Sequence, residues 1–351
     1  MSPRLCLMLG LACFIAAQAL ASLALTPLRG ALVPNRDVYG ALKPGEFAGT
    51  LMLGGFRGLA CDLLWLRAES AKDKGQFYES LALAGSISQI QPRFEQIWEY
   101  MAWDMAYNIA AEIEDGDGKW AWYVAGVDVN TRGCLRNPQS ERLVRHLAWM
   151  FHHKGDDFRE RIENSEWATR LNPLLVRLNA QMPAARQLPL LPAGKGLGNF
   201  QLSERLYSAA LLICELNGKR PLPYLLRQVA IAIERDGNRL RNRGEHLAAL
   251  RRYLESLAAW DRVRSWSNET PADADDGQDR RVARDIAEHN DGRMRRKCTL
   301  LAQRLADDAA RGQRLAEIID ARRFAEADRE LAGPGWRASV TQEHARWLDE
   351  R

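Results

Sequence analysis

The fold is decided by residues 54–173, which begin with GGFRGLACDLLWLRAESAKDKGQFYES (residues 54–80) and end at Pro173. Aromatic and small residues recur along this stretch at the spacing of a helix face. Prolines at positions 92, 138 and 173 each follow an apolar run, and a proline there is expected to close a helix pair. The pattern predicts successive helix pairs, which stack into binding surfaces and not into reaction centres.

The first predicted helix begins near Phe56. Phe56, Leu59, Leu63 and Leu66 are spaced three, four and three residues apart and form one apolar stripe. Gly75 is expected to end this helix in the left-handed conformation. Its partner helix, residues 76–91, is expected to stop before the first proline.

A second pair is predicted over residues 94–112 and 119–135. Trp98 and Ala102 form one face of the first of these helices, whereas Trp103 and Tyr107 form another, so neighbours are expected on both sides. The spacing from Pro92 to Pro138 is 11 residues longer than the spacing from Pro138 to Pro173. We expect the extra residues in a lengthened turn at Asp115–Gly118.

These residues resemble the tetratricopeptide repeat. The resemblance rests on a tryptophan in the first helix, a glycine at the turn and a closing proline, and it covers about a third of the chain. It also extends to membrane-anchored bacterial proteins of that repeat class whose role is uncharacterised. The matching residues are Gly75, Phe77, Tyr78 and Pro92 in the first unit, Trp98 and Pro138 in the second, and Trp149, Gly155 and Pro173 in the third. The resemblance implies a helical-repeat solenoid that binds proteins.

The N-terminus predicts a membrane segment. Residues 5–25 carry no charged side chain, and this length crosses a bilayer as a helix. A cleaved signal peptide is the alternative, since Ala17-Gln18-Ala19 fits a small-x-small cleavage site. We favour a single-pass anchor, because the apolar run exceeds the usual signal core. Either interpretation sends the bulk of the chain to the extracytoplasmic side of a membrane.

The expected fold class is all-α, a tetratricopeptide-like solenoid with an N-terminal transmembrane helix and additional C-terminal helices. The expected organisation is an anchor or signal peptide (1–25), a tether (26–55), helical repeats (56–180), a Pro/Gly linker (181–201) and a C-terminal helical region (202–351). Cys61 and Cys214 lie among Leu and Ala and are expected as small core residues.

Three motifs contain the residue types of a metal, calcium or phosphate site but lack the spacing that such a site requires. His146, His153 and Asp157 could form a polar or metal-binding site, yet no HExxH spacing accompanies them. The loop beginning at Asp115 fails the calcium pattern at its fifth, sixth and twelfth positions. Gly194–Gly198 is rich in glycine without the GxxxxGK[ST] order of a phosphate loop.

The leading functional prediction is a membrane-tethered scaffold or adaptor that holds a protein or peptide partner of unknown identity. Trp103, Tyr107 and Trp149 are the candidate partner-binding residues, with Arg side chains as further anchors. A metal-dependent enzyme or accessory is one alternative, and a self-associating structural protein of the envelope is another. We expect no catalytic residue, cofactor or metal, and no nucleic acid, since a net charge of +4 is small for 351 residues.

Overall fold

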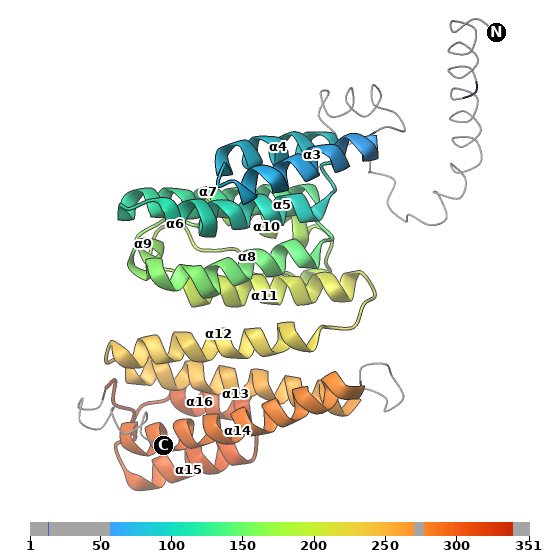
Figure 1. Cartoon of the computed structure of the whole chain (residues 1–351). Helices are drawn as coiled ribbons and strands as arrows, with labels where there is room; N and C mark the ends of the chain where they lie inside the picture. Colours follow the sequence, from blue (N-terminus) through green and yellow to red (C-terminus); the bar gives the residue numbers. More distant parts are fainter. Residues whose placement is uncertain (1–12, 14–56, 270–276, 340–351) are drawn as a thin grey trace, which may run out of the picture. The chain divides into compact units, whose positions relative to one another are not determined.

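The computed structural model describes residue 13, residues 57–269 and residues 277–339. These residues are all-α and contain no β-strand, only one isolated antiparallel bridge between Ala306 and Trp336. The predicted fold class is therefore confirmed at the level of an all-α protein. The elements in chain order are α3 (Arg57–Asp73), α4 (Phe77–Ile90), α5 (Glu95–Trp103), η3 (Asp104–Ile109), α6 (Ala110–Glu112), α7 (Gly116–Arg136), α8 (Glu141–His153), η4 (Lys154–Phe158), α9 (Arg159–Glu163), α10 (Ala168–Asn179), η5 (Ala184–Arg186), α11 (Asn199–Leu216), α12 (Pro223–Asn242), α13 (His246–Glu269), α14 (Gly277–Leu305), α15 (Ala309–Asp320) and α16 (Phe324–Ala332) (Figure 1).

The predicted anchor and the predicted tether lie outside the described residues, apart from Cys13. Within the part of the chain that the structure describes, no helix combines the length and apolar character needed to cross a bilayer. Cys61 and Cys214 are buried, as predicted, and none of the described cysteines forms a disulfide.

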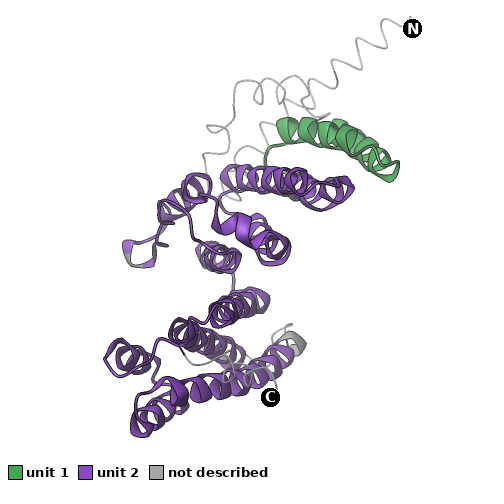
Figure 2. Cartoon of the chain, turned by 90° about the vertical axis from the view of Figure 1, so that its left-hand side faces the viewer, with its two compact units in different colours: residues 1–97 green, residues 98–351 purple. Residues whose placement is uncertain are grey.

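The chain divides into two compact units, residues 1–97 and 98–351 (Figure 2). In the first unit, α3 and α4 form a hairpin. Gly75 has a φ of 72° between them, and the Gln76 amide donates to the Ala71 carbonyl, which is the bond of a Schellman motif. This confirms the predicted glycine cap.

In the second unit, neighbouring helices pack in a chain of contacts. α7 packs on η3 and α8, and α8 packs on α11, after which α11 to α15 each contact the next helix. Gly126 of α7 lets that helix approach closely, because a Cβ there would lie 2.7 Å from the Ala102 carbonyl oxygen. Gly133 does the same against Trp98, where a Cβ would lie 2.7 Å from the Trp98 Cβ.

The second predicted helix pair has a short turn and long helices. Only three residues, Ile113–Asp115, separate α6 from α7, and the Asp115 side chain caps α7 by accepting a hydrogen bond from the Gly118 amide. The prediction of a lengthened turn at Asp115–Gly118 is therefore wrong. Asp115 and its neighbouring glycines begin a helix because a carboxylate satisfies an amide that the first turn leaves without a partner.

The third predicted unit departs from the expected form. Pro173 lies inside α10 and does not close it, so that prediction is wrong. α8 packs on α11, while α10 packs on α7. Helices α4 and α7 end shortly before Pro92 and Pro138, as predicted, whereas no helix ends at Pro173.

Residues 188–191, within the predicted Pro/Gly linker, are held against α10. The Asn172 side chain donates to the Leu191 carbonyl (3.0 Å) and accepts from the Leu191 amide (2.8 Å). About two turns further along the same face of α10, Asn179 makes the same pair of bonds with the backbone of Leu188, both at 2.8 Å. Each amide side chain thus replaces the partner strand that an extended segment would need.

Candidate partner-binding surface

The three residues predicted to bind a partner meet in one aromatic stack. Trp103 and Tyr107 stack with ring centroids 4.3 Å apart, and Trp149 lies 5.2 Å from Trp103 and 5.3 Å from Tyr107. His153 continues the series, 4.7 Å from the Trp149 ring and nearly parallel to it. We call these four side chains the aromatic stack.

Two elements that are distant in sequence build the stack. Trp103 ends α5 and Tyr107 lies in the π-helical turn η3, whereas Trp149 and His153 are one turn apart on α8. A π-turn widens the helix locally, and such turns occur frequently at functional sites. Because both pairs are spaced four residues apart, each helix presents two rings on one face.

The stack is open to solvent along one side. Trp103 is 39% exposed and His153 is exposed, while Tyr107 and Trp149 are half-buried. The opposite face of the same helix is closed, since Ala102 and Ala106 are fully buried. The second apolar face that the sequence predicts is thus only partly covered by the residues that the structure describes.

His146 is buried beside the Trp149 ring of the stack. Its ring lies 6.2 Å from Trp149, and its Nδ1 lies 2.8 Å from the Asn130 Oδ1. The Asn130 Nδ2 donates to the Leu143 carbonyl, so Oδ1 is the acceptor and the proton of His146 sits on Nδ1. Burial lowers the pKa of His146 to about 4, so the ring is neutral at pH 7.

A charged pair covers the edge of the stack. The Lys154 Nζ lies 5.7 Å from the centre of the Tyr107 ring and 3.0 Å from an Asp157 carboxylate oxygen. Burial raises the pKa of the Tyr107 hydroxyl, and the Asp157 carboxylate raises it further, so Tyr107 is neutral at all ordinary pH values. Lys154 was not among the residues predicted from the sequence; its position directly after the end of α8, which carries Trp149 and His153, is the signal that could have indicated it.

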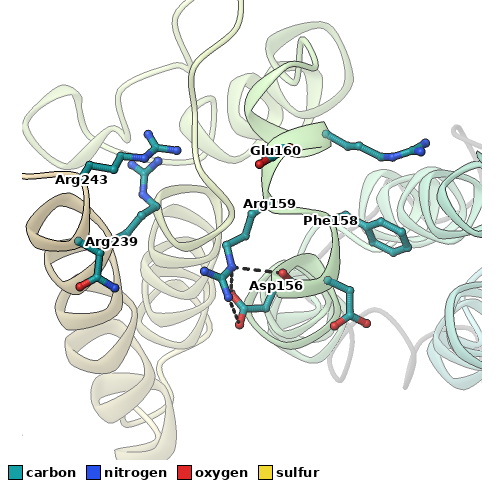
Figure 3. Close-up of a pocket in the computed structure, with 9 residues that line it drawn as sticks. Asp156, Phe158, Arg159, Glu160, Arg239 and Arg243 are labelled. Carbon is teal, nitrogen blue, oxygen red and sulfur yellow. Dashed lines mark hydrogen bonds and ion pairs between the residues drawn. The ribbon is translucent and has the colours of Figure 1, made fainter. Parts of the chain in front are cut away.

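Asp157, which pairs with Lys154 at the edge of the stack, also lines a pocket of ≈ 500 Å³. Figure 3 shows Arg239, on α12, and Arg243, directly after the end of α12, facing Arg159 and Glu160 across this pocket. Its full lining is Asp156, Asp157, Phe158, Arg159, Glu160, Arg161, Arg239, Asn242 and Arg243.

The arginines of this pocket differ in how firmly they are held. Arg239, whose side chain is only 10% exposed, lies between the carboxylates of Glu163 and Asp236 and joins α9 to α12. Arg159 binds only Asp156, its neighbour three residues earlier, and its side chain is 55% exposed. Arg243 shares Glu163 with Arg239 and is 47% exposed. Two of the guanidinium groups can therefore change partner at small cost, since exposed ion pairs contribute about 0–1 kcal/mol.

The residues proposed for a metal or enzyme site do not converge. His146 bonds Asn130, His153 lies in the stack and Asp157 binds Lys154. Across residues 57–269 and 277–339, no three His, Cys, Asp or Glu side chains are arranged to hold a metal ion.

No protein-family model matches this chain, and no curated protein or solved structure was found to be similar to it.

Proposed function

We propose that this chain is a membrane-tethered helical scaffold that holds a protein or peptide partner on the aromatic stack. The observation that carries the proposal is the meeting of Trp103, Tyr107 and Trp149 in a stack that solvent reaches. Side chains of this kind contribute most of the binding energy at protein interfaces, because they bury a large area with little loss of rotamer freedom.

The partner is expected to contribute an aromatic or apolar side chain. A ring laid on the exposed edge of Trp103 would extend the stack at the same spacing of about 4–5 Å that its members keep. The stack is already ordered by His146 beside Trp149 and by Lys154 at its edge, so little conformational entropy is lost on binding.

The arginine pocket gives the partner a second contact. An acidic side chain located next to the apolar anchor could bind Arg159 and Arg243, the two guanidinium groups whose present pairs are exposed. Bidentate bonds from arginine to a carboxylate fix orientation as well as affinity. We therefore expect a partner segment in which an acidic residue lies close to an aromatic or large apolar one.

The test is site-specific photocrosslinking in the full chain. A photoreactive phenylalanine analogue at position 103 is expected to capture one partner reproducibly, and the same analogue at Val176 serves as the matched control. Val176 is 53% exposed on α10 and is an apolar surface position outside the stack. Capture at position 103 is expected to be lost when Trp149 is replaced by alanine.

Once a partner is identified, its affinity measures the two contacts separately. Trp103→Ala is expected to weaken binding about 30-fold or more, the effect of a loss of at least ~2 kcal/mol at a central aromatic residue. Arg159→Gln with Arg243→Gln is expected to weaken it less and to remove most of its salt dependence. Equal capture at positions 103 and 176, or affinity unchanged by Trp103→Ala, would refute the proposal.

A further inference from the structure

Three large apolar side chains of helix α3 lie on the side of the helix that faces away from α4. The residues that face α4 and are buried are small: Cys61, Ala68 and Ala71. On the opposite face, Leu59, Leu63 and Leu66 are 55%, 60% and 66% exposed. Three leucines in one exposed row form an apolar surface that the packing of α3 on α4 does not cover.

The spacing of the row is that of a coiled-coil seam. Leu59, Leu63 and Leu66 are separated by four and three residues, which places them at positions d, a and d of a heptad. Cys61 and Ala68 then fall at position f, directly opposite the seam, and both are buried against α4. One heptad assignment thus accounts for both faces of the helix.

The charges beside the row match a second copy of the same helix. In a parallel pair, position g of one helix lies beside the position e five residues later on its partner. Asp62 and Glu69 fall at g, whereas Arg67 falls at e and Lys74, in the turn directly after α3, follows at the next e. Both contacts between copies, Asp62 with Arg67 and Glu69 with Lys74, therefore join an acid to a base.

We infer that α3 pairs in parallel with α3 of a second copy of this chain. A lipid surface fits less well, because helices that lie on membranes are rich in basic residues beside the apolar face, and the four flanking charges here cancel. Arg67 already binds Glu79 of α4 at 2.7 Å, but that pair is exposed and does not prevent a further contact.

The seam is short, and this sets the conditions for pairing. Coiled coils that hold without other contacts have apolar seams of three to four heptads or more, whereas the leucines of this seam, residues 59–66, span only about one heptad. Pairing therefore depends on copies being concentrated and aligned, which the predicted N-terminal anchor would do in a membrane. The inference does not rest on the partner-binding surface.

Disulfide trapping of the full chain in phosphatidylcholine vesicles tests the pairing. Cys6 and Cys13 are first replaced by serine, and Ser70→Cys then places a thiol at the exposed a position that follows Leu66. In a parallel pair the two residues 70 face each other within the reach of a disulfide, whereas in an antiparallel pair they lie at opposite ends. The matched control is Ser86→Cys, which is exposed on α4.

Mild oxidation is expected to link the Ser70→Cys protein into dimers at least tenfold faster than the Ser86→Cys protein. Leu63→Glu is expected to reduce the linked fraction to the level of the control, while helix content stays unchanged because residue 63 is on the surface. Glu69→Lys and Lys74→Glu are each expected to reduce linking about threefold, and the two together to restore it, since g–e contacts contribute a few tenths of a kcal/mol each.

Three results would overturn the inference. No linking through residue 70 would mean that residues 26–56 of the same chain, or lipid, cover the leucines. Equal linking at positions 70 and 86 would indicate random collision in the vesicles. Linking that survives Leu63→Glu would mean that copies meet through another surface.

Discussion

Acid is expected to destabilise this protein through two buried histidines. His146 and His152 each have a pKa lowered to about 4, chiefly by burial, against an ordinary value near 6.5. Both are buried against neutral partners: His146 bonds Asn130 (2.8 Å), and the His152 Nδ1 lies 3.3 Å from the Ser203 hydroxyl. The unfolded chain takes up protons below pH 6.5 that the folded chain does not, so the free energy of unfolding falls from pH 6.5 to about pH 4.

The size of the effect follows from these two pKa values. At pH 5 each histidine lowers the free energy of unfolding by about 2 kcal/mol relative to pH 8, and the two together by about 4 kcal/mol. The change is to be measured by urea denaturation at pH 8 and pH 5. Carboxylates contribute to the same loss, so the comparison is between the native chain and His146→Gln or His152→Gln.

In the native chain the free energy of unfolding is lower at pH 5 than at pH 8. In each of these variants this decrease is expected to be about 2 kcal/mol smaller, whatever the variant's stability at pH 8. His289→Gln, at an exposed position, is the control and should retain the whole difference. A variant at position 146 or 152 with the pH dependence of the native chain would refute the reasoning that burial keeps these rings neutral.

Three further substitutions test the packing of the fold. Asp236→Asn removes a fully buried charge from its ion pairs with Arg239 and Arg252 and is expected to cost about 3–5 kcal/mol in denaturation, whereas Glu288→Gln, in an exposed pair, should cost less than about 0.5 kcal/mol. Gly126→Val places a Cβ 2.7 Å from the Ala102 carbonyl oxygen and is expected to lower the free energy of unfolding by about 3 kcal/mol. A decrease no larger than that caused by a valine at an exposed helix position would contradict the close approach. Gly85→Ala, in α4 with no atom within 4 Å of the added Cβ, is expected to stabilise the chain by up to about 1 kcal/mol.

Local signals in the sequence predicted the helices well. Gly75, Pro92 and Pro138 end or separate helices where they were expected to, because glycine and proline act through backbone conformation alone. The two-faced pattern of residues 98–107 also predicted correctly that Trp103 and Tyr107 would share a surface.

Features that depend on distant contacts were not predictable from these signals. Pro173 is tolerated inside α10, and no local pattern distinguishes it from Pro138. The π-helical turn η3 has no sequence signature either. The stacking of Trp149 on Trp103 depends on α8 packing beside η3, a pairing across more than forty residues that periodicity on one helix cannot reveal. The arginine pocket required the meeting of α9 with α12, which are further apart still.

The segment held by Asn172 and Asn179 has the composition of a flexible connector, but it is attached to α10 like a short strand to a sheet edge. A connector tolerates added residues, whereas a segment whose amides pair in register does not. Lengthening the chain between Leu188 and Leu191 by one residue would break one of the two pairs of bonds. Among the Pro- and Gly-rich stretches of this chain, evolution is therefore expected to preserve the length of this one more strictly than its amino acids.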